Sequence, residues 1–309
     1  MRVLFLAAAL WFVAASIARQ WPDVRQSLAT AHPAWGLVAL STSIVFVAYA
    51  VLIQAWRLML TPWRVTISFW ASARIWFISN LGRYVPGKVW QIAAMSALAQ
   101  EEGVSPVAAT GSALIVNLAN VLSGVVVVIA SGPRLLDVTT HGRSGSAMVL
   151  VTVLLAGLLA LPAVLPVAMR VTNRLIGRSW TPPMIPHRTI WAAVAGTLVS
   201  WVLYGLAFTL LAHALLRPTQ GSPLDFIAIY TVSYLAGYLF LPAPGGIGVR
   251  EWAMVRGLTA LGLATPGDAW MLAFGSRLWL TVLEALPGIV WITTGHRRPQ
   301  PPTLQPDNL

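Results

Sequence analysis

The sequence LPAPGGIGVREW, residues 241–252, lies between two apolar segments of the chain. Proline has no backbone N–H group and glycine adopts conformations that other residues avoid, so this stretch should interrupt a helix. Arg250 and Glu251 place two adjacent charges beside the break. What surrounds the stretch decides whether it is a loop in water or a break inside a membrane.

The composition indicates that membrane helices surround it. Of the 309 residues, 57% are hydrophobic and 9% are charged, and the mean hydropathy is +0.74. These values lie outside the range of soluble domains. Uninterrupted apolar runs of about 20 residues indicate transmembrane helices rather than a β-barrel. The sequence therefore predicts an all-α polytopic membrane protein.

The charged residues and histidines argue against several other classes of protein. The formal net charge is +11, but most arginines lie in short loops between apolar runs. This pattern orients membrane helices, so we expect no nucleic-acid partner. The chain has no cysteine and its five histidines lack metal-site spacing, so we expect no metal and no cofactor. The spans contain no catalytic constellation, and we do not expect an enzyme.

Two kinds of apolar segment alternate along the chain. Residues 67–100 and 224–263 are interrupted by glycine, proline and charges, whereas six other segments are long and continuous. The first continuous segment also fits a signal peptide, but a retained helix is favoured because the chain after it is already membrane-embedded. The six continuous segments are Val3–Ala18, Trp35–Leu60, Val107–Ser131, Ala147–Met169, Thr189–Leu216 and Trp270–Thr294.

The basic loops predict the topology. Arginines occur after the second span, between residues 170 and 188, and after the last span. These three places and both termini should therefore be cytoplasmic. Each interrupted region must then enter and leave on the same side. The arm Lys88–Gln100 has 13 residues, about 20 Å, which favours a re-entrant hairpin over a full span. Residues 1–295 form a single transmembrane domain, and residues 296–309 a disordered cytoplasmic tail.

The two halves of the chain resemble each other. A shift of 160 residues places Gln91 on Glu251 and Asn117 on Arg277. Repeat one (about residues 3–131) and repeat two (about 147–294) each read as helix, helix, broken hairpin and helix. With one hairpin opening inward and the other outward, the halves are inverted-topology repeats. This arrangement is typical of transporters, whose substrate site lies where the discontinuous helices meet.

The first hairpin contains a candidate anion site. Pro86 and Gly87 should end one helix, and a second helix should begin at about Lys88. The free N–H groups of the second helix, with Arg83, Lys88 and the nearby Gln91, form a corner suited to a phosphate. The alternative is a cytoplasmic amphipathic loop whose cations contact lipid headgroups.

The second hairpin repeats this design at the stretch quoted above. A helix should begin near Val249, with Arg250 and Glu251 in its first turn. The glycines are not a dinucleotide fingerprint, because no strand precedes them. The alternative is that the two charges pair structurally with other helices. The residues that break the helix are Pro244, Gly245, Gly246 and Gly248.

The last span carries Arg277 and Glu284 on one helical face. Each charge costs on the order of 3 kcal/mol to insert, so both should face the bundle interior. We predict Arg277 as a headgroup ligand and Glu284 as its orienting or counter-charge partner, with Asn117 at the position equivalent to Arg277. The alternative is a buried structural ion pair.

The motifs GRYVPGK (residues 82–88) and PGGIGVRE (244–251) carry a family resemblance. In this order they resemble the lysylphosphatidylglycerol synthase transmembrane-region family, which includes the flippase half of the bacterial multiple peptide resistance factor and stand-alone YbhN-like membrane proteins. The resemblance implies a multi-pass protein of the bacterial inner membrane that moves phospholipids, aminoacylated phosphatidylglycerol in the best-known members. No aminoacyltransferase domain follows Thr294, so we expect the chain to make no lipid itself.

The leading hypothesis is therefore a phospholipid flippase that moves an anionic or zwitterionic lipid, aminoacylated or not, between leaflets. Two alternatives stay open: a secondary transporter of a small anionic solute, and a non-transporting membrane partner of a lipid-modifying synthase. The expected partners are a membrane phospholipid and, in the last case, a separate lipid-modifying enzyme. The sequence is also compatible with a homo-oligomer.

Overall fold

The computed structural model describes residues 33–84, 89–140, 185–216, 221–240 and 244–294, together with Arg25 and Ser27. Every regular element in these ranges is a helix, which confirms the all-α prediction. Several predictions lie outside the described residues: the spans at residues 3–18 and 147–169, the tail at 296–309, and the break residues Pro86 and Gly87.

Four helices are long and apolar enough to cross a membrane. They coincide closely with four of the six predicted spans, and a short 3-10 turn, Thr61–Trp63, extends the first of them. The four helices are α2 (Trp35–Leu60), α5 (Pro106–Ser131), α8 (His187–Leu215) and α11 (Pro266–Thr293).

Both interrupted regions fold as pairs of helices with a break between them. α3 (Phe69–Asn80) ends in the 3-10 turn η2 (Leu81–Tyr84) before α4 (Val89–Glu101). α9 (Pro223–Leu239) is followed by the 3-10 turn η3 (Pro244–Gly246) and α10 (Val249–Ala260). These four helices have 12, 13, 17 and 12 residues, fewer than the roughly 20 that cross a bilayer. A further short helix, α6 (Pro133–Thr140), follows α5.

Local chemistry fixes where three of the helices begin. Ser105, Ser222 and Thr265 each precede a proline, and each side chain accepts a hydrogen bond from a backbone N–H in the first turn. Proline suits the first helical position because the N–H that it lacks would have no helical partner there. The starts of α5, α9 and α11 are therefore encoded within a few residues.

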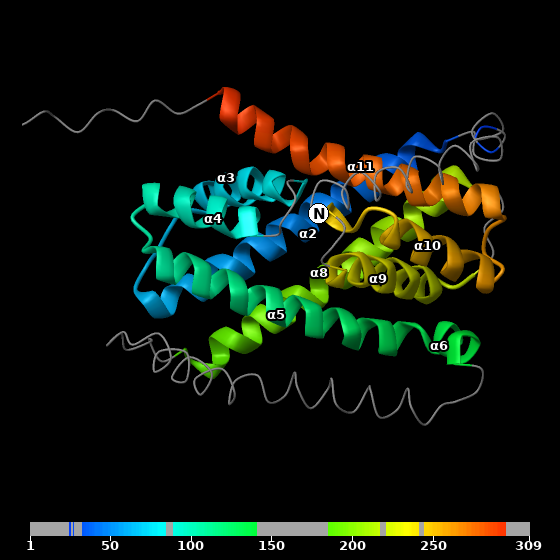
Figure 1. Cartoon of the computed structure of the whole chain (residues 1–309), viewed down its shortest axis with the longest axis horizontal. Coiled ribbons are helices and arrows are strands. Elements are labelled where there is room, and N and C mark those ends of the chain that lie inside the picture. Colours follow the sequence, from blue (N-terminus) through cyan, green and yellow to red (C-terminus); the bar gives the residue numbers. More distant parts are fainter. Residues whose placement is uncertain are drawn as a thin grey trace, which may run out of the picture.

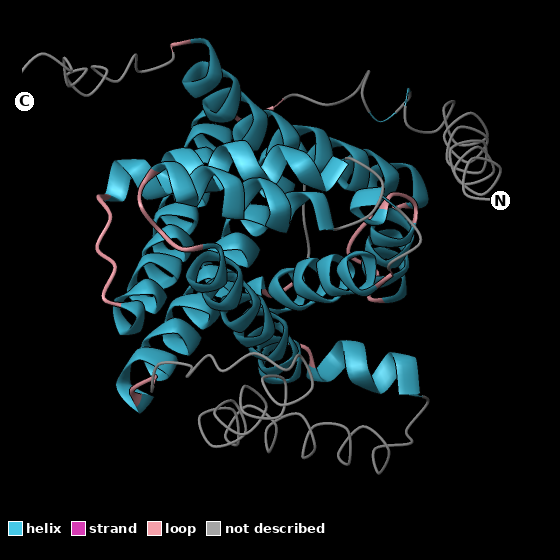
Figure 2. Ribbon diagram, turned by 60° about the vertical axis from the view of Figure 1, so that its left-hand side comes forward, coloured by secondary structure: helices cyan, strands magenta, loops and turns pink. Residues whose placement is uncertain are grey.

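Helices of one half of the chain pack against helices of the other half (Figure 1). α2 lies along α8, α5 packs on α9, and α11 packs on α3. Each long helix that follows a hairpin thus contacts the first helix of the other hairpin. Figure 2 shows the helices crossing in several layers around the middle of the molecule. This packing brings the hairpin tips together, and η2 contacts η3.

The second tip folds tightly against its own hairpin. Gly245 and Gly246 have positive φ angles of 58° and 68°, a region that glycine adopts without steric cost. A Cβ atom on Gly246 would lie 2.5 Å from the carbonyl oxygen of Gly237 in α9. The glycines of the break therefore allow both the turn and the contact between tip and helix.

This close approach predicts that Gly246→Ala strongly destabilises the protein. The substitution adds a clash with backbone to a left-handed strain of about 1–2 kcal/mol, and we expect a loss well above that figure. Gly262→Ala is the matched control, because Gly262 has a φ of 66° but nothing within 4 Å of an added Cβ. Thermal unfolding in detergent, followed by tryptophan fluorescence, measures both variants. Equal losses of stability would show that the contact with Gly237 does not matter.

Candidate functional site

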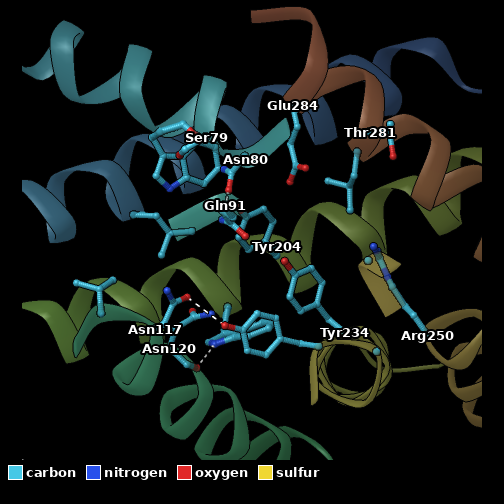
Figure 3. A pocket seen from close by; sticks show the side chains of 18 of the residues that line it. Ser79, Asn80, Gln91, Asn117, Asn120, Tyr204, Tyr234, Arg250, Thr281 and Glu284 are labelled. Carbon is cyan, nitrogen blue, oxygen red and sulfur yellow. Dashed lines mark hydrogen bonds between the residues drawn. The ribbon is translucent and has the colours of Figure 1, made fainter. Parts of the chain in front are cut away.

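A cavity of about 170 Å³ lies where the two hairpin tips meet. Residues of α2, α3, α4, α5, α8, α9, α10 and α11 line it, so both halves of the chain contribute. Figure 3 shows polar side chains directed toward this space from several helices, among them Asn80, Gln91, Tyr234, Arg250 and Glu284. A polar space among apolar membrane helices is unusual and marks a candidate binding site.

Arg277, which lines the cavity, forms an ion pair with Glu251. Glu251 is buried in the first turn of α10, and one of its carboxylate oxygens accepts a hydrogen bond from Nη1 of Arg277. Its other oxygen accepts from the backbone N–H of Gly248 at 2.6 Å. Nη2 of Arg277 donates to the carbonyl oxygen of Gly245 at 3.0 Å. Arg277 and Glu251 thus join α11 to the broken backbone of the second hairpin.

This network differs from the pairing suggested by the sequence. The structure pairs Arg277 with Glu251, where the sequence suggested Glu284. The reason is tertiary: α10 packs on α11 and presents its first turn to Arg277. Glu284 lines the same cavity farther along α11 (Figure 3).

Arg250 is the exceptional cation of the site. The residue is only 9% exposed, and its guanidinium lies over the rings of Tyr230 and Tyr234, 5.5 Å and 5.3 Å from their centroids. Its buried Nε and Nη2 atoms have no hydrogen-bond partner among the described residues. The two aromatic rings stabilise the charge by cation–π attraction, but two nitrogen atoms are left to donate to another group.

Amide side chains from α3, α4 and α5 also line the cavity. Nε2 of Gln91 donates to Oδ1 of Asn80 at 2.5 Å, and the hydroxyl of Tyr238 donates to Oδ1 of Asn117 at 3.3 Å. Asn80 is 2% exposed, and its Nδ2 has no partner within the described part of the chain. The Asn80 amide therefore also retains hydrogen-bonding capacity.

The structure places most of the predicted site residues together. Gln91, Asn117, Arg250, Arg277 and Glu284 line the cavity, and Glu251 lies behind them on Arg277. The side chains of Arg83 and Lys88 lie outside the described residues. α10 begins at Val249 and α4 at Val89, in agreement with the predicted helix starts.

Sequence reasoning missed several residues that line the cavity. Tyr230, Tyr234 and Tyr238 are four residues apart and so share one face of α9. This spacing is visible in the sequence and could have identified the aromatic stripe. Asn80 and Asn120 carry no comparable signal, because only the packing of α3 and α5 brings them to the cavity.

The residues that the structure describes include no group of three or more histidine, cysteine or acidic side chains that could hold a metal ion. The cavity lining offers arginines, amides, hydroxyls, aromatic rings and the carboxylate of Glu284. Such a set binds a polar or anionic group by charge-assisted and neutral hydrogen bonds.

Fold and site together define a class: a helical membrane protein in which two broken hairpins meet around a buried polar cavity. Residues 1–288 match the family described as the lysylphosphatidylglycerol synthase TM region, and the chain belongs to this family. The description names the membrane region of a lipid synthase, which links the chain to lipid handling. No curated protein matches the chain.

The ion pair predicts a strong energetic coupling between Glu251 and Arg277. Glu251→Gln leaves the Arg277 charge without its partner in a largely buried place, and we expect a loss of about 3 kcal/mol. The double variant with Arg277→Met should lose less than the sum of the two single variants, because it removes both charges. Unfolding of all three variants in detergent measures the coupling.

The exposed pair of Arg74 with Glu101 is the control for this experiment, since the Glu101 side chain is 52% exposed. Glu101→Gln should change stability by less than about 1 kcal/mol. Additive losses at Glu251 and Arg277 would contradict a structural ion pair.

Proposed function

We propose that the protein translocates phospholipids between the leaflets of the bacterial inner membrane, with the headgroup in the central cavity and the acyl chains in lipid. The observation that carries the proposal is Arg250, a buried cation with two unpaired nitrogen atoms at a polar cavity among helices long and apolar enough to cross a membrane. An anionic headgroup would supply the acceptors that these donors lack. The family supports the same direction, because its description names the membrane region of a lipid synthase.

We further propose that the two halves are inverted repeats and that both hairpins are re-entrant. The shortness of the four hairpin helices supports re-entrance, since none reaches the length of a full span. α5 of the first half packs on α9 of the second, and α11 of the second half packs on α3 of the first. A two-fold relation between the halves would produce this reciprocal pair of contacts. The arginine-rich loops support cytoplasmic termini.

In this scheme the hairpin tips act as two gates. η2 and η3 contact each other beside the cavity, so separation of the tips toward one side or the other would open a path for the headgroup. The Glu251–Arg277 ion pair links the tip of the second hairpin to α11. The tip and α11 would therefore move together. Rocking of one repeat against the other then gives alternating access.

A transporter of a small anionic solute is the second candidate, because Arg250 would also meet the charge of a free anion. The lipid-linked family favours the lipid. A non-transporting partner of a synthase would share the fold but would move no lipid when purified. The two alternatives therefore differ from the flippase in what the pure protein transports.

The test is a translocation assay in liposomes that contain phosphatidylglycerol with a fluorophore on an acyl chain. A membrane-impermeant quencher added outside reports how fast inner-leaflet lipid reaches the outer leaflet. We expect the protein to accelerate this exchange, and Arg250→Gln to slow it about tenfold or more because the charge-assisted bonds to phosphate are lost.

Arg256→Gln is the matched control for Arg250→Gln. Arg256 lies on the same helix but is exposed, over the ring of Trp252 at 5.6 Å. It should leave the rate unchanged. Wild-type protein that moves lipid no faster than empty liposomes would refute the proposed function.

A further inference from the structure

We infer that one phospholipid headgroup binds to both hairpin tips at once, with Asn80 of the first hairpin as a binding residue beside Arg250 of the second. Asn80 thereby joins the site of the proposed function, on which this assignment rests. The headgroup then forms a bridge between the two halves of the chain.

Asn80 is a buried donor at the first tip. It is the last residue of α3 and directly precedes η2. The residue is 2% exposed, and its Nδ2 atom has no hydrogen-bond partner among the described residues. Nε2 of Gln91 donates to its Oδ1 atom at 2.5 Å, so the acceptor of the Asn80 amide is used and the donor is left. Because an amide nitrogen only donates, the group that completes Asn80 must offer an acceptor.

Arg250 presents the same requirement from the second tip. It is the second residue of α10, shortly after η3. Its Nε and Nη2 atoms are buried and have no partner in the described part of the chain. These two atoms form one edge of the guanidinium, which donates two parallel hydrogen bonds to a pair of oxygen atoms. Both tips therefore present donors that lack acceptors.

The donors of the two tips face one space. Among the described residues that line the cavity of about 170 Å³, Asn80 and Arg250 are the two with buried unpartnered atoms. Figure 3 shows their side chains reaching the cavity from different sides, so a ligand that contacts both must span it. A phosphodiester and its adjoining ester groups offer several oxygen acceptors in one molecule. Since unpaired buried donors cost free energy, such a ligand gains most when it satisfies both tips.

The bridge uses the part of a phospholipid that all headgroup types share. The phosphodiester oxygens are the same whether the headgroup carries a hydroxyl group or an amine. Glu284 adds a carboxylate to the lining of the cavity, so a headgroup amine is compatible with the same site. Aminoacylated and unmodified lipids can therefore both be held from the two tips.

A ligand held from both tips links their motions. η2 and η3 contact each other, and the cavity lies beside this contact. A ligand favours the arrangement that it binds best, and only joined tips offer it both Asn80 and Arg250. Release toward either side of the membrane therefore requires that the headgroup first loses its hydrogen bonds to one tip.

Lipid binding to the purified full chain tests the role of Asn80. Native mass spectrometry counts the bound lipids and compares the affinities for phosphatidylglycerol and phosphatidylethanolamine. Asn80→Asp keeps the shape of the side chain and the acceptor for Gln91, but it replaces the donor with a second acceptor. We expect it to weaken binding of both lipids about tenfold more than the control variant does, because a charge-assisted hydrogen bond is lost.

Asn120→Asp is the matched control. Asn120 lines the same cavity and has no buried unpartnered atom, so its replacement adds the same charge without removing such a donor. Equal weakening by the two variants would show that the added charge alone acts, and would overturn the role of Asn80. Two cavity lipids in the wild-type protein, of which Arg250→Gln loses one and Asn80→Asp the other, would overturn the bridge.

The link between the tips has a measurement of its own, which leaves the cavity residues unchanged. The chain has no cysteine, so spin labels attach only at introduced sites. Trp90→Cys on α4 and Trp252→Cys on α10 replace side chains that are 55% and 57% exposed. We expect phosphatidylglycerol to narrow the distribution of distances between the labels, measured by double electron–electron resonance. A distribution that the lipid leaves unchanged would contradict the bridge.

Glycerol phosphate and the translocation assay separate the bridge from the proposed function. Binding that depends on Asn80 in a protein that moves no lipid would refute the flippase and leave the bridge intact. Displacement of phosphatidylglycerol by glycerol phosphate at equal concentration, with the same dependence on Asn80, would keep the bridge but make a soluble anion its ligand. Translocation that is equally fast in Asn80→Asp and Asn120→Asp would support the flippase and overturn the bridge.

Discussion

The hydrogen bonds of Arg277 and Glu251 to the broken backbone are the interaction on which the second half of the structure depends. A helix that stops inside a membrane domain exposes N–H and C=O groups that water does not satisfy. Arg277 donates to the carbonyl oxygen of Gly245, and Glu251 accepts from the N–H of Gly248. These two side chains also form an ion pair with each other. Their opposite charges therefore compensate at the place where they form hydrogen bonds with the broken backbone. The hairpin tip, α10 and α11 are thereby held as one unit.

This pairing also determines the character of the cavity. Arg277 is paired with Glu251, whereas the neighbouring Arg250 contacts the rings of Tyr230 and Tyr234 and forms no ion pair with another described residue. Gln91 and Asn117, which a shift of 160 residues aligns with Glu251 and Arg277, add amide groups to the same cavity.

Much of the fold could be predicted from local patterns. Uninterrupted apolar runs located α2, α5, α8 and α11, and the proline and glycine cluster at residues 244–248 located the break of the second hairpin. These predictions succeed because each depends on the length of a segment or on the backbone chemistry of a few adjacent residues. The site was only partly predictable. Charged residues inside apolar segments pointed to Arg250, Glu251, Arg277 and Glu284, but not to the partner of each.

The sequence by itself determined the helical membrane class, the family motifs, the helix starts and the position of the breaks, because these follow from composition and from chemistry within one or two turns. Only the tertiary structure decided that Arg277 pairs with Glu251, that Arg250 lies between two tyrosines with unpaired donors, and that Asn80 reaches the same cavity. These relations join residues of different helices. Their geometry depends on how α3, α9, α10 and α11 pack, and the periodicity of a single helix carries no information about that packing.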